Sequence, residues 1–259
     1  MQNWKLTLTY DGTGFHGWQV QPGLRTVQGE LQHALGRVLR ESPLPQGSGR
    51  TDAGVHALGQ VASFSLAAPI PPPNLERALN RTLPPSIRVL ETLQVGEGFH
   101  ARHSAAAKTY EYRIFRGELC SPFMAPYVHS CRWPLDMDRL RVAAEDVVGE
   151  HDFVSLAASD PDLATREEGD GPSTVRTIFE SAWVEQPGDL LVYRVRGSGF
   201  LHHMVRNLVG TMTEIGRGQF PADAMPSILA AKARSAAGPT APARGLFLHS
   251  VEYPPESLL

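Results

Sequence analysis

The chain has 259 residues, of which 42% are hydrophobic and 20% charged, a composition that argues against extended disorder and is ordinary for a globular protein. This length suits one large domain or two modest ones. The formal net charge is −3, so the average charge gives no support for binding to a nucleic acid. No apolar run approaches the roughly 20 residues of a membrane helix, and residues 1–8 hold no signal core, so we expect a cytoplasmic location.

The first half of the sequence predicts the order β-α-β-α-β. Apolar residues alternate with polar ones from Trp4 to Tyr10, which predicts a half-buried strand that ends at a glycine-rich turn. Thr26 can cap a helix whose apolar residues recur at helical spacing up to Leu39. The remaining elements predicted in this half are a strand at 60–66, a helix at about 75–83 and a strand at about 87–94.

The second half begins in the same way, with a strand at 110–114 and a helix at about 136–148. An acidic stretch up to Ser173 is predicted to be a surface loop. After it we expect a hairpin with strands at 175–185 and 190–196, a helix at 201–215, a short helix and a last strand at 246–253. The elements predict an α+β protein with two ferredoxin-like (RRM-like) halves, 1–104 and 105–259, that form a central, mostly antiparallel sheet with flanking helices and a cleft between the halves.

The charges are unevenly distributed along the chain. Residues 145–170 hold nine acids against one arginine, whereas residues 190–213 contain no acid. The small net charge therefore conceals separate acidic and basic stretches of the chain. Cys120 and Cys131 are the only cysteines, and no Cys or His residues are paired at ligand spacing, so neither a disulfide framework nor a zinc site is indicated.

Asp52 is a candidate catalytic residue because of its setting. It lies in a short loop beside Arg50, and Gly49 and Gly54 allow tight turns and the close approach of a sugar or phosphate. Arg50 would keep Asp52 ionised. An ionised carboxylate can act as a nucleophile or base at a sugar carbon, or stabilise an oxocarbenium-like centre. The alternative is an Asx turn that closes a loop.

Sequence segments spread over the whole chain add to this interpretation. They are Tyr10-Asp11-Gly12-Thr13, Phe15-His16-Gly17-Trp18-Gln19, Thr26-Val27-Gln28-Gly29-Glu30-Leu31, the Asp52 loop through His56, Phe99-His100-Ala101-Arg102, Lys108-Thr109-Tyr110-Glu111-Tyr112, Gly149-Glu150-His151-Asp152-Phe153, Val175-Arg176-Thr177-Ile178, Gly199-Phe200-Leu201, Met204-Val205-Arg206-Asn207 and Ala241-Pro242-Ala243-Arg244-Gly245-Leu246. Together they resemble the tRNA pseudouridine synthase A (TruA) family. The departures are Leu156, where an aromatic residue is expected, and the long acidic stretch before Ser173; both concern peripheral recognition more than chemistry.

The resemblance implies isomerisation of uridine to pseudouridine at positions 38, 39 and 40 in the anticodon stem-loop of tRNA, by a homodimer that needs no cofactor and no metal. The target nucleotide must be flipped out of its stack, which costs a few kcal/mol. By resemblance Asp52 acts at the ribose, either by attack on C1′ or by removal of the C2′ proton. The sequence does not choose between these two routes.

Three further residues are candidates for the active site. Tyr110 corresponds to the family tyrosine that stacks on the target base and can take the C5 proton, and a phenol suits both tasks. A strand aromatic facing the core is the alternative, which we prefer for Tyr112. Arg50 is expected to pair with Asp52 and to fill the space left by the flipped base; a structural loop salt bridge is the alternative. Leu246 is expected to line the uracil pocket, or else to be a core leucine.

Basic residues are candidates for contacts with the phosphates of tRNA in the predicted cleft. Arg206 has the best claim, because the opposite face of its predicted helix is apolar and its neighbourhood lacks acids. Each of the others is by itself more simply a solvated charge: they are Arg102, Lys108, Arg113, His202 and His203. Adjacent histidines on a helix point in different directions and no third ligand is apparent, so we expect no metal at His202 and His203.

Two other classes of function compete with this interpretation. A non-catalytic RNA-binding module would use exposed aromatics and basic loops, but the anionic Asp52 serves phosphate binding poorly. A retaining glycosidase or nucleoside hydrolase needs a second positioned carboxylate or metal-binding aspartates, and none is apparent near Asp52. The product separates the three, because isomerisation leaves the RNA mass unchanged, hydrolysis releases uracil, and binding alone does neither.

Overall fold

The computed structural model describes residues 1–158 and 173–259. The acidic stretch predicted to be a surface loop lies largely outside these described residues. Among the helices in the two described ranges, none is long and apolar enough to cross a lipid bilayer.

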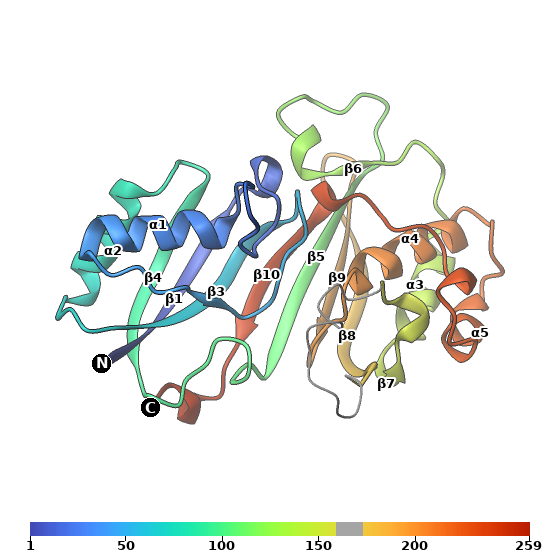
Figure 1. Ribbon diagram of the computed structural model, residues 1–259. Helices are drawn as coiled ribbons and strands as arrows, with labels where there is room; N and C mark the ends of the chain where they lie inside the picture. The colour runs from blue at the N-terminus through green and yellow to red at the C-terminus, as the bar shows by residue number, and fades with distance from the viewer. Residues whose placement is uncertain (159–172) are drawn as a thin grey trace. The chain divides into compact units, whose positions relative to one another are not determined.

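The described chain divides into two compact units. The first comprises Met1–Thr109 and Phe247–Leu259, and the second comprises Tyr110–Leu246. The chain passes from the first unit to the second inside strand β5 (Ala107–Phe115) and returns at the start of strand β10 (Leu246–Glu252), as can be followed by colour in Figure 1. The first unit therefore combines two ranges that are distant in the sequence, whereas the second is a single range.

The strands of the first unit lie in the order β4, β1, β3, β10. Strand β1 (Gln2–Tyr10) runs antiparallel to β3 (His56–Leu66) and to β4 (Ile87–Val95), and β10 runs parallel to β3. The short strand β2 (Gln46–Gly47) also pairs with β3. Strand β1 is thus an inner strand, and its buried and half-buried residues alternate as the sequence predicts.

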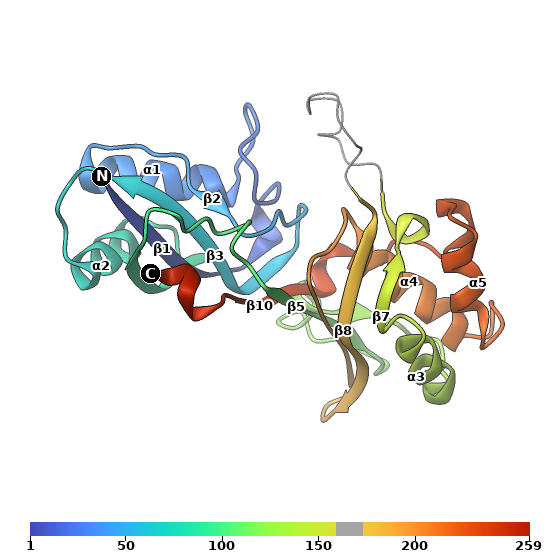
Figure 2. The same cartoon turned by 90° about the horizontal axis from the view of Figure 1, so that it is seen from below.

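Two helices pack against each other in the first unit, α1 (Val27–Leu39) and α2 (Pro72–Thr82). Figures 1 and 2 show them beside the strands of this unit. The predicted cap of α1 is confirmed, since the Thr26 hydroxyl accepts a hydrogen bond from the Gly29 N–H at 3.3 Å. Leu31 and its apolar neighbours at helical spacing are buried, which fixes the face that α1 turns toward the sheet.

Strand β3 begins at His56, four residues before the predicted start at 60. The extension is tertiary in origin. His56 and Ala57 pair with the start of β10, and a β-carbon on Gly59 would lie 2.6 Å from the carbonyl oxygen of His249 in that strand. At Gly59 the backbone of β10 occupies the space that a side chain would take in a regular strand. The sequence there therefore lacks the alternation of apolar and polar residues that predicts a strand. As a result, the loop that carries Asp52 leads directly into a central strand.

The strands of the second unit lie in the order β5, β9, β8, β7. Strands β7 (Gly149–Asp152) and β9 (Leu190–Gly197) run antiparallel to β8 (Val175–Gln186), and β6 (His129–Ser130) pairs parallel with β5. The predicted hairpin of β8 and β9 is confirmed, whereas the sequence pattern did not predict the short strand β7.

Helices α3 (Met137–Glu145) and α4 (Met204–Gly216) pack against each other in the second unit, and α3 also contacts β8 (Figures 1 and 2). A shorter helix, α5 (Ala224–Ala230), follows α4. Helix α4 begins three residues later than predicted, because the residue before it, His203, has a left-handed φ of +58° that is incompatible with a helix.

The α+β class and the mostly antiparallel pairing of the strands are confirmed by this arrangement. The ferredoxin-like arrangement, the cleft, and the division into residues 1–104 and 105–259 stay predictions.

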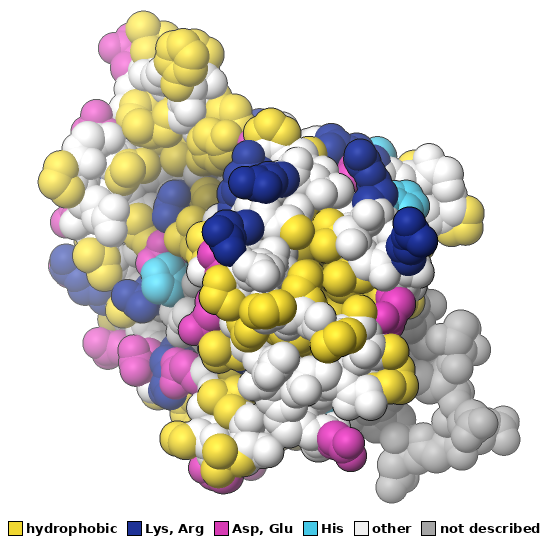
Figure 3. Space-filling model, turned by 90° about the vertical axis from the view of Figure 1, so that its left-hand side faces the viewer, with side chains coloured by type: hydrophobic (Ala, Val, Ile, Leu, Met, Phe, Trp, Pro, Cys, Tyr) yellow, Lys and Arg dark blue, Asp and Glu magenta, His cyan; other side chains and the backbone are white. Residues whose placement is uncertain are grey.

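Figure 3 shows one face of the first unit, on which Lys and Arg side chains lie among hydrophobic and acidic ones. The exposed cations of this unit include Arg25, Arg50 and Arg102. Local positive regions are therefore compatible with a net charge of −3. Such a region attracts an anionic ligand over about one Debye length, roughly 8–10 Å at physiological salt.

Two glycines inside helices should respond in opposite ways to substitution by alanine. Gly210 of α4 lies against the backbone of Pro239, and a β-carbon there would overlap the Pro239 carbonyl oxygen. We expect Gly210→Ala to destabilise the protein by about 1–3 kcal/mol, because overpacking against backbone outweighs the gain in helix propensity of about 1 kcal/mol.

Gly36 of α1 is the matched control, since a β-carbon there would meet the Ser42 side chain at 3.4 Å, an ordinary contact. Gly36→Ala should raise the melting temperature by a few degrees, while Gly210→Ala should lower it. Differential scanning calorimetry measures both, and a Gly210→Ala protein as stable as wild type would contradict the close approach at Pro239.

Candidate active site

The loop that carries Asp52 is held by backbone hydrogen bonds to the segment that follows β1. The Trp18 N–H donates to the Thr51 carbonyl at 3.0 Å, and the Gly54 N–H donates to the Phe15 carbonyl at 3.3 Å. Asp52 is thus tied on both sides to the same segment of the first unit. Main-chain bonds of this kind fix the position of a loop more tightly than exposed side-chain contacts do.

The contact between the two segments leaves no room for a β-carbon at two positions. A β-carbon on Gly17 would lie 2.6 Å from the Thr51 carbonyl oxygen, and the φ of Gly17 is +84°, in the left-handed region that favours glycine. A β-carbon on Gly12 would overlap the Val55 carbonyl oxygen. Glycines outside the loop, as well as Gly54 inside it, are therefore needed to place Asp52.

His56 ties the end of the loop to the turn after β1. Its side chain is 1% exposed, and its ring stacks on Phe247 with centroids 4.7 Å apart. The His56 Nδ1 lies 3.1 Å from the Gly12 nitrogen and 3.2 Å from the Asp11 carboxylate. An unprotonated Nδ1 accepts from Gly12, and a protonated one donates to Asp11, so the turn is held in either state.

Buried polar groups support the loop from the core side. The Tyr10 hydroxyl and the Thr51 hydroxyl are 2.8 Å apart, and both residues are buried. Burial raises the pKa of Tyr10 to about 12, so its hydroxyl keeps its proton at neutral pH and can donate it. The sequence pattern assigns Tyr10 only to the core of β1. It carries no signal for a partner 41 residues away.

Asp52 is half-buried and Arg50 is exposed. The structure thus presents a carboxylate at the surface of a loop whose backbone is fixed on both sides. A carboxylate held in this way can attack an electrophilic carbon or remove a proton without first ordering the loop.

Lys108 lies in the first unit, and its Nζ donates a hydrogen bond to the Ser48 carbonyl at 2.5 Å. Its ammonium group therefore contacts the start of the Asp52 loop. Arg102 is exposed in a turn, where the backbone N–H groups of Arg102 and His103 lie 3.1 and 3.3 Å from the His100 Nδ1. Partial burial lowers the pKa of His100, and the nearby His103 and Arg102 lower it further.

Tyr110 belongs to the second unit and is 8% exposed. The rings of Tyr110 and Phe200 meet edge to face, with their centroids 5.0 Å apart and their planes at 78°. Tyr112 is fully buried and its hydroxyl donates to the Pro242 carbonyl at 2.8 Å, which agrees with its predicted place in the core. Burial raises the pKa of Tyr112.

Residues 241–246 of the second unit lead from a contact with Arg206 to Leu246. The Arg206 Nε donates to the Ala241 carbonyl at 2.8 Å, and the Ala241 N–H donates back to the Arg206 carbonyl at 3.1 Å. The segment continues to Gly245, which packs directly on the Tyr112 ring, and then to Leu246, which is 6% exposed. Arg206 is thus a half-buried residue that orients the backbone leading to Leu246.

The expectation that His202 and His203 point in different directions is wrong. Both residues precede α4 rather than lying in it, and their ring centroids are 4.0 Å apart. The left-handed conformation of His203 turns the backbone so that the rings meet. Arg113, another of the basic candidates, has a guanidinium nitrogen 3.4 Å from the Glu111 carboxylate.

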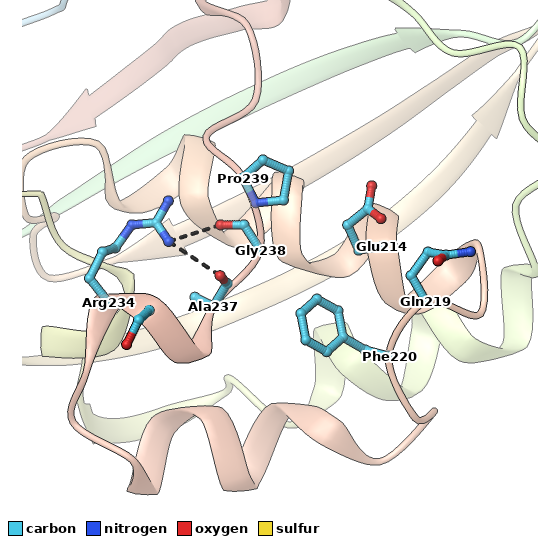
Figure 4. Close-up of a pocket in the computed structure, with 8 residues that line it drawn as sticks. Glu214, Gln219, Phe220, Arg234, Ala237, Gly238 and Pro239 are labelled. Carbon is cyan, nitrogen blue, oxygen red and sulfur yellow. Dashed lines mark hydrogen bonds between the residues drawn. The ribbon is translucent and has the colours of Figure 1, made fainter.

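A hollow of about 720 Å³ lies in the second unit between the end of α4 and the segment that follows α5 (Figure 4). Its charged groups already have partners: Glu214 pairs with Arg217 at 2.7 Å, and Arg234 donates to the carbonyls of Ala237 and Gly238. Among the described residues, none of those predicted for the active site lines it. The lining consists of Glu214, Gln219, Phe220, Arg234, Ser235, Ala237, Gly238 and Pro239.

The chain resembles known proteins both in sequence and in structure. A solved archaeal box H/ACA sRNP Nop10-Cbf5 complex aligns with 81% of this chain and 44% of its own at 14% identity, with a TM-score of 0.33. A protein of Solibacter usitatus (strain Ellin6076) called tRNA pseudouridine synthase A is 53% identical over 98% of this chain and 100% of its own.

Proteins with the same name from Moorella thermoacetica (strain ATCC 39073 / JCM 9320) and Limosilactobacillus fermentum (strain NBRC 3956 / LMG 18251) are 45% and 44% identical. They cover 96% and 98% of this chain, and 98% and 96% of their own lengths. The family model described as tRNA pseudouridine synthase matches residues 7–104 and 143–254. The chain therefore belongs to the tRNA pseudouridine synthase A (TruA) family, whose members are isomerases that form pseudouridine in tRNA.

Proposed function

We propose that this chain converts uridine to pseudouridine at positions 38, 39 and 40 of the tRNA anticodon stem-loop, with Asp52 acting at the ribose. The observation that carries this proposal is the fixed Asp52 loop, in which backbone bonds from Trp18 and to Phe15 hold a half-buried carboxylate in place. Family membership supplies the substrate class and the reaction type.

The proposed reaction moves the uracil from one attachment to another on the same ribose. The bond between N1 and C1′ breaks, a bond between C5 and C1′ forms, and the C5 proton is lost while N1 gains one. Asp52 either attacks C1′ to form a glycosyl ester or removes the C2′ proton to form a glycal; both routes require the ionised carboxylate. The target nucleotide must first be flipped out, at a cost of a few kcal/mol.

Tyr110 stacks on the flipped base and takes the C5 proton in the last step. Support comes from the edge-to-face contact with Phe200, which holds the ring of Tyr110 in one orientation. Tyr110 is only 8% exposed, so neighbouring side chains position its ring. To act as the proton acceptor, its phenol gives up its own proton as it takes the one from C5.

The remaining candidates bind the substrate. Arg50 is exposed and fills the space left by the base, while Arg102, Lys108 and Arg206 contact phosphates. Leu246 lines the uracil pocket.

In this proposal, residues 1–104 supply the catalytic loop and residues 105–259 supply the groups that contact the base. The enzyme works as a homodimer in the cytoplasm, where its tRNA substrate is made.

We expect Asp52→Asn and Asp52→Ala to abolish pseudouridine formation, because neither an amide nor a methyl group can replace the carboxylate. The rate should fall below about one-thousandth of the wild-type rate while tRNA binding is retained. Carbodiimide-and-alkali primer extension on an unmodified tRNA with uridine at 38–40 reports the product. Asp138→Asn, which alters an exposed carboxylate on α3, is the control that should remain active.

Stops at these positions with the Asp52 variants would contradict the catalytic role of Asp52. If the wild-type chain binds the tRNA but yields no stops, the chain acts on this tRNA as a non-catalytic RNA-binding protein.

Tyr110→Phe separates stacking from proton transfer, because it keeps the ring and removes the hydroxyl. We expect the rate of tritium release from C5-tritiated uridine in tRNA to fall by about 10²–10⁴-fold, with tRNA affinity unchanged. Tyr112→Phe removes a buried hydroxyl that bonds to Pro242, so it should cost about 1 kcal/mol of stability and leave tritium release unaffected. Normal release by Tyr110→Phe would restrict Tyr110 to stacking.

A further inference from the structure

The side-chain amide of Gln60 is buried directly beneath the start of the Asp52 loop. Gln60 is 0% exposed. Its Oε1 accepts from the Ser48 hydroxyl at 2.7 Å, and its Nε2 donates to the Gly49 carbonyl at 2.9 Å. The Oε1 also accepts from the Val61 N–H at 3.2 Å, and the Nε2 lies 3.4 Å from the Tyr10 hydroxyl oxygen. All the hydrogen-bonding positions of the amide are therefore used.

Tyr10 extends these contacts to the other side of Arg50. When the Tyr10 oxygen accepts from the Gln60 Nε2, its proton is available to the Thr51 hydroxyl, 2.8 Å away. Gly49 and Thr51 flank Arg50 in the sequence, so one buried amide contacts the loop on both sides of it, at the Gly49 carbonyl directly and at the Thr51 hydroxyl through Tyr10. Asp52 is the next residue.

We propose that Gln60 is a positioning residue for the catalytic loop: by holding Gly49 directly and Thr51 through Tyr10, it sets the position of Arg50 and Asp52. This inference rests on the proposed role of Asp52. Its physical basis is that reacting groups must lie within a few tenths of an ångström of their productive geometry. A misplacement of about 1 Å costs on the order of 10²-fold in rate. Gln60 touches no reacting atom in this scheme.

The competing explanation is that Gln60 only stabilises the core, as many buried amides do. The chain provides a control with the same bonding pattern. Asn3 is 9% exposed, its Nδ2 donates to the carbonyls of Gly96 and Phe99 at 3.0 and 2.9 Å, and its Oδ1 accepts from the Trp4 N–H at 3.2 Å. Asn3 lies seven residues before Tyr10 on β1, about 23 Å at 3.3 Å per residue, so it is far from the loop.

The experiment compares Gln60→Met with Asn3→Leu in the full-length chain. Each substitution replaces a buried amide by an apolar side chain of similar size. Gln60→Met removes the donor to the Gly49 carbonyl and the Tyr10 hydroxyl, and Asn3→Leu removes the donor to the carbonyls of Gly96 and Phe99. Melting temperature, affinity for unmodified tRNA, and the single-turnover rate of pseudouridine formation at saturating enzyme are measured for each variant.

We expect both variants to lose stability, and Gln60→Met alone to lose about 100-fold in single-turnover rate, with tRNA affinity unchanged. Equal rates for Gln60→Met and wild type, or an equal loss for Asn3→Leu, would overturn the inference.

Tyr10→Phe provides a second test that removes only one hydroxyl, and it decides the question if Gln60→Met does not fold. It should reduce the single-turnover rate by about 10-fold, because the Gly49 carbonyl keeps its bond to Gln60 while the Thr51 hydroxyl loses its bond to Tyr10. Where Gln60→Met folds, the double variant should be no slower than Gln60→Met, since residues in one hydrogen-bond network are not additive. A Tyr10→Phe chain with the wild-type rate, or a double variant whose losses multiply, would count against the network.

The two proposals fail in different ways. A wild-type chain that forms no pseudouridine refutes the proposed function and this inference together. An active wild-type chain with an equally active Gln60→Met variant refutes this inference alone.

Discussion

The Asp52 loop depends on a contact between two backbones that leaves no space for a β-carbon. Gly12 and Gly17 bring the segment after β1 against residues 51–55, and main-chain hydrogen bonds from Trp18 and to Phe15 hold the two segments together. Because the contact is made by main-chain atoms, few side-chain torsions can loosen it. A carboxylate carried on such a loop is ordered before substrate arrives, so binding energy is not spent on ordering it.

The second unit uses the same kind of contact around α4. Gly210 allows the backbone at Pro239 to approach the helix, and reciprocal bonds between Arg206 and Ala241 hold the chain that continues to Leu246. Leu246 therefore takes its position from main-chain contacts, as Asp52 does in the first unit. In both places glycine is required because another backbone occupies the space of its side chain.

Two basic residues have a structural role in addition to the charge that they carry. Lys108 donates to the Ser48 carbonyl and Arg206 to the Ala241 carbonyl, so each cation orients main chain near a residue proposed to contact substrate. The hydrogen bond to the main chain fixes the position of the positive charge. Loss of either side chain would alter the local backbone as well as remove a positive charge.

The sequence by itself determined those features that depend on local pattern. The alternation of β1, the Thr26 cap, the hairpin of β8 and β9 and the α+β class follow from short-range spacing and backbone preferences. The glycines and the arginine beside Asp52 make it a candidate for catalysis, a role that stays a proposal.

Only the tertiary structure decided which distant groups meet. The start of β3 at His56, the contact of Tyr10 with Thr51 and that of Lys108 with Ser48 join residues 41 to 60 positions apart or depend on the pairing of β3 with β10. Hydrophobic periodicity records which face of an element is buried, but it does not record which polar group of another element lies opposite. For that reason the loop could be recognised from the sequence, whereas the buried side chains that hold it could not.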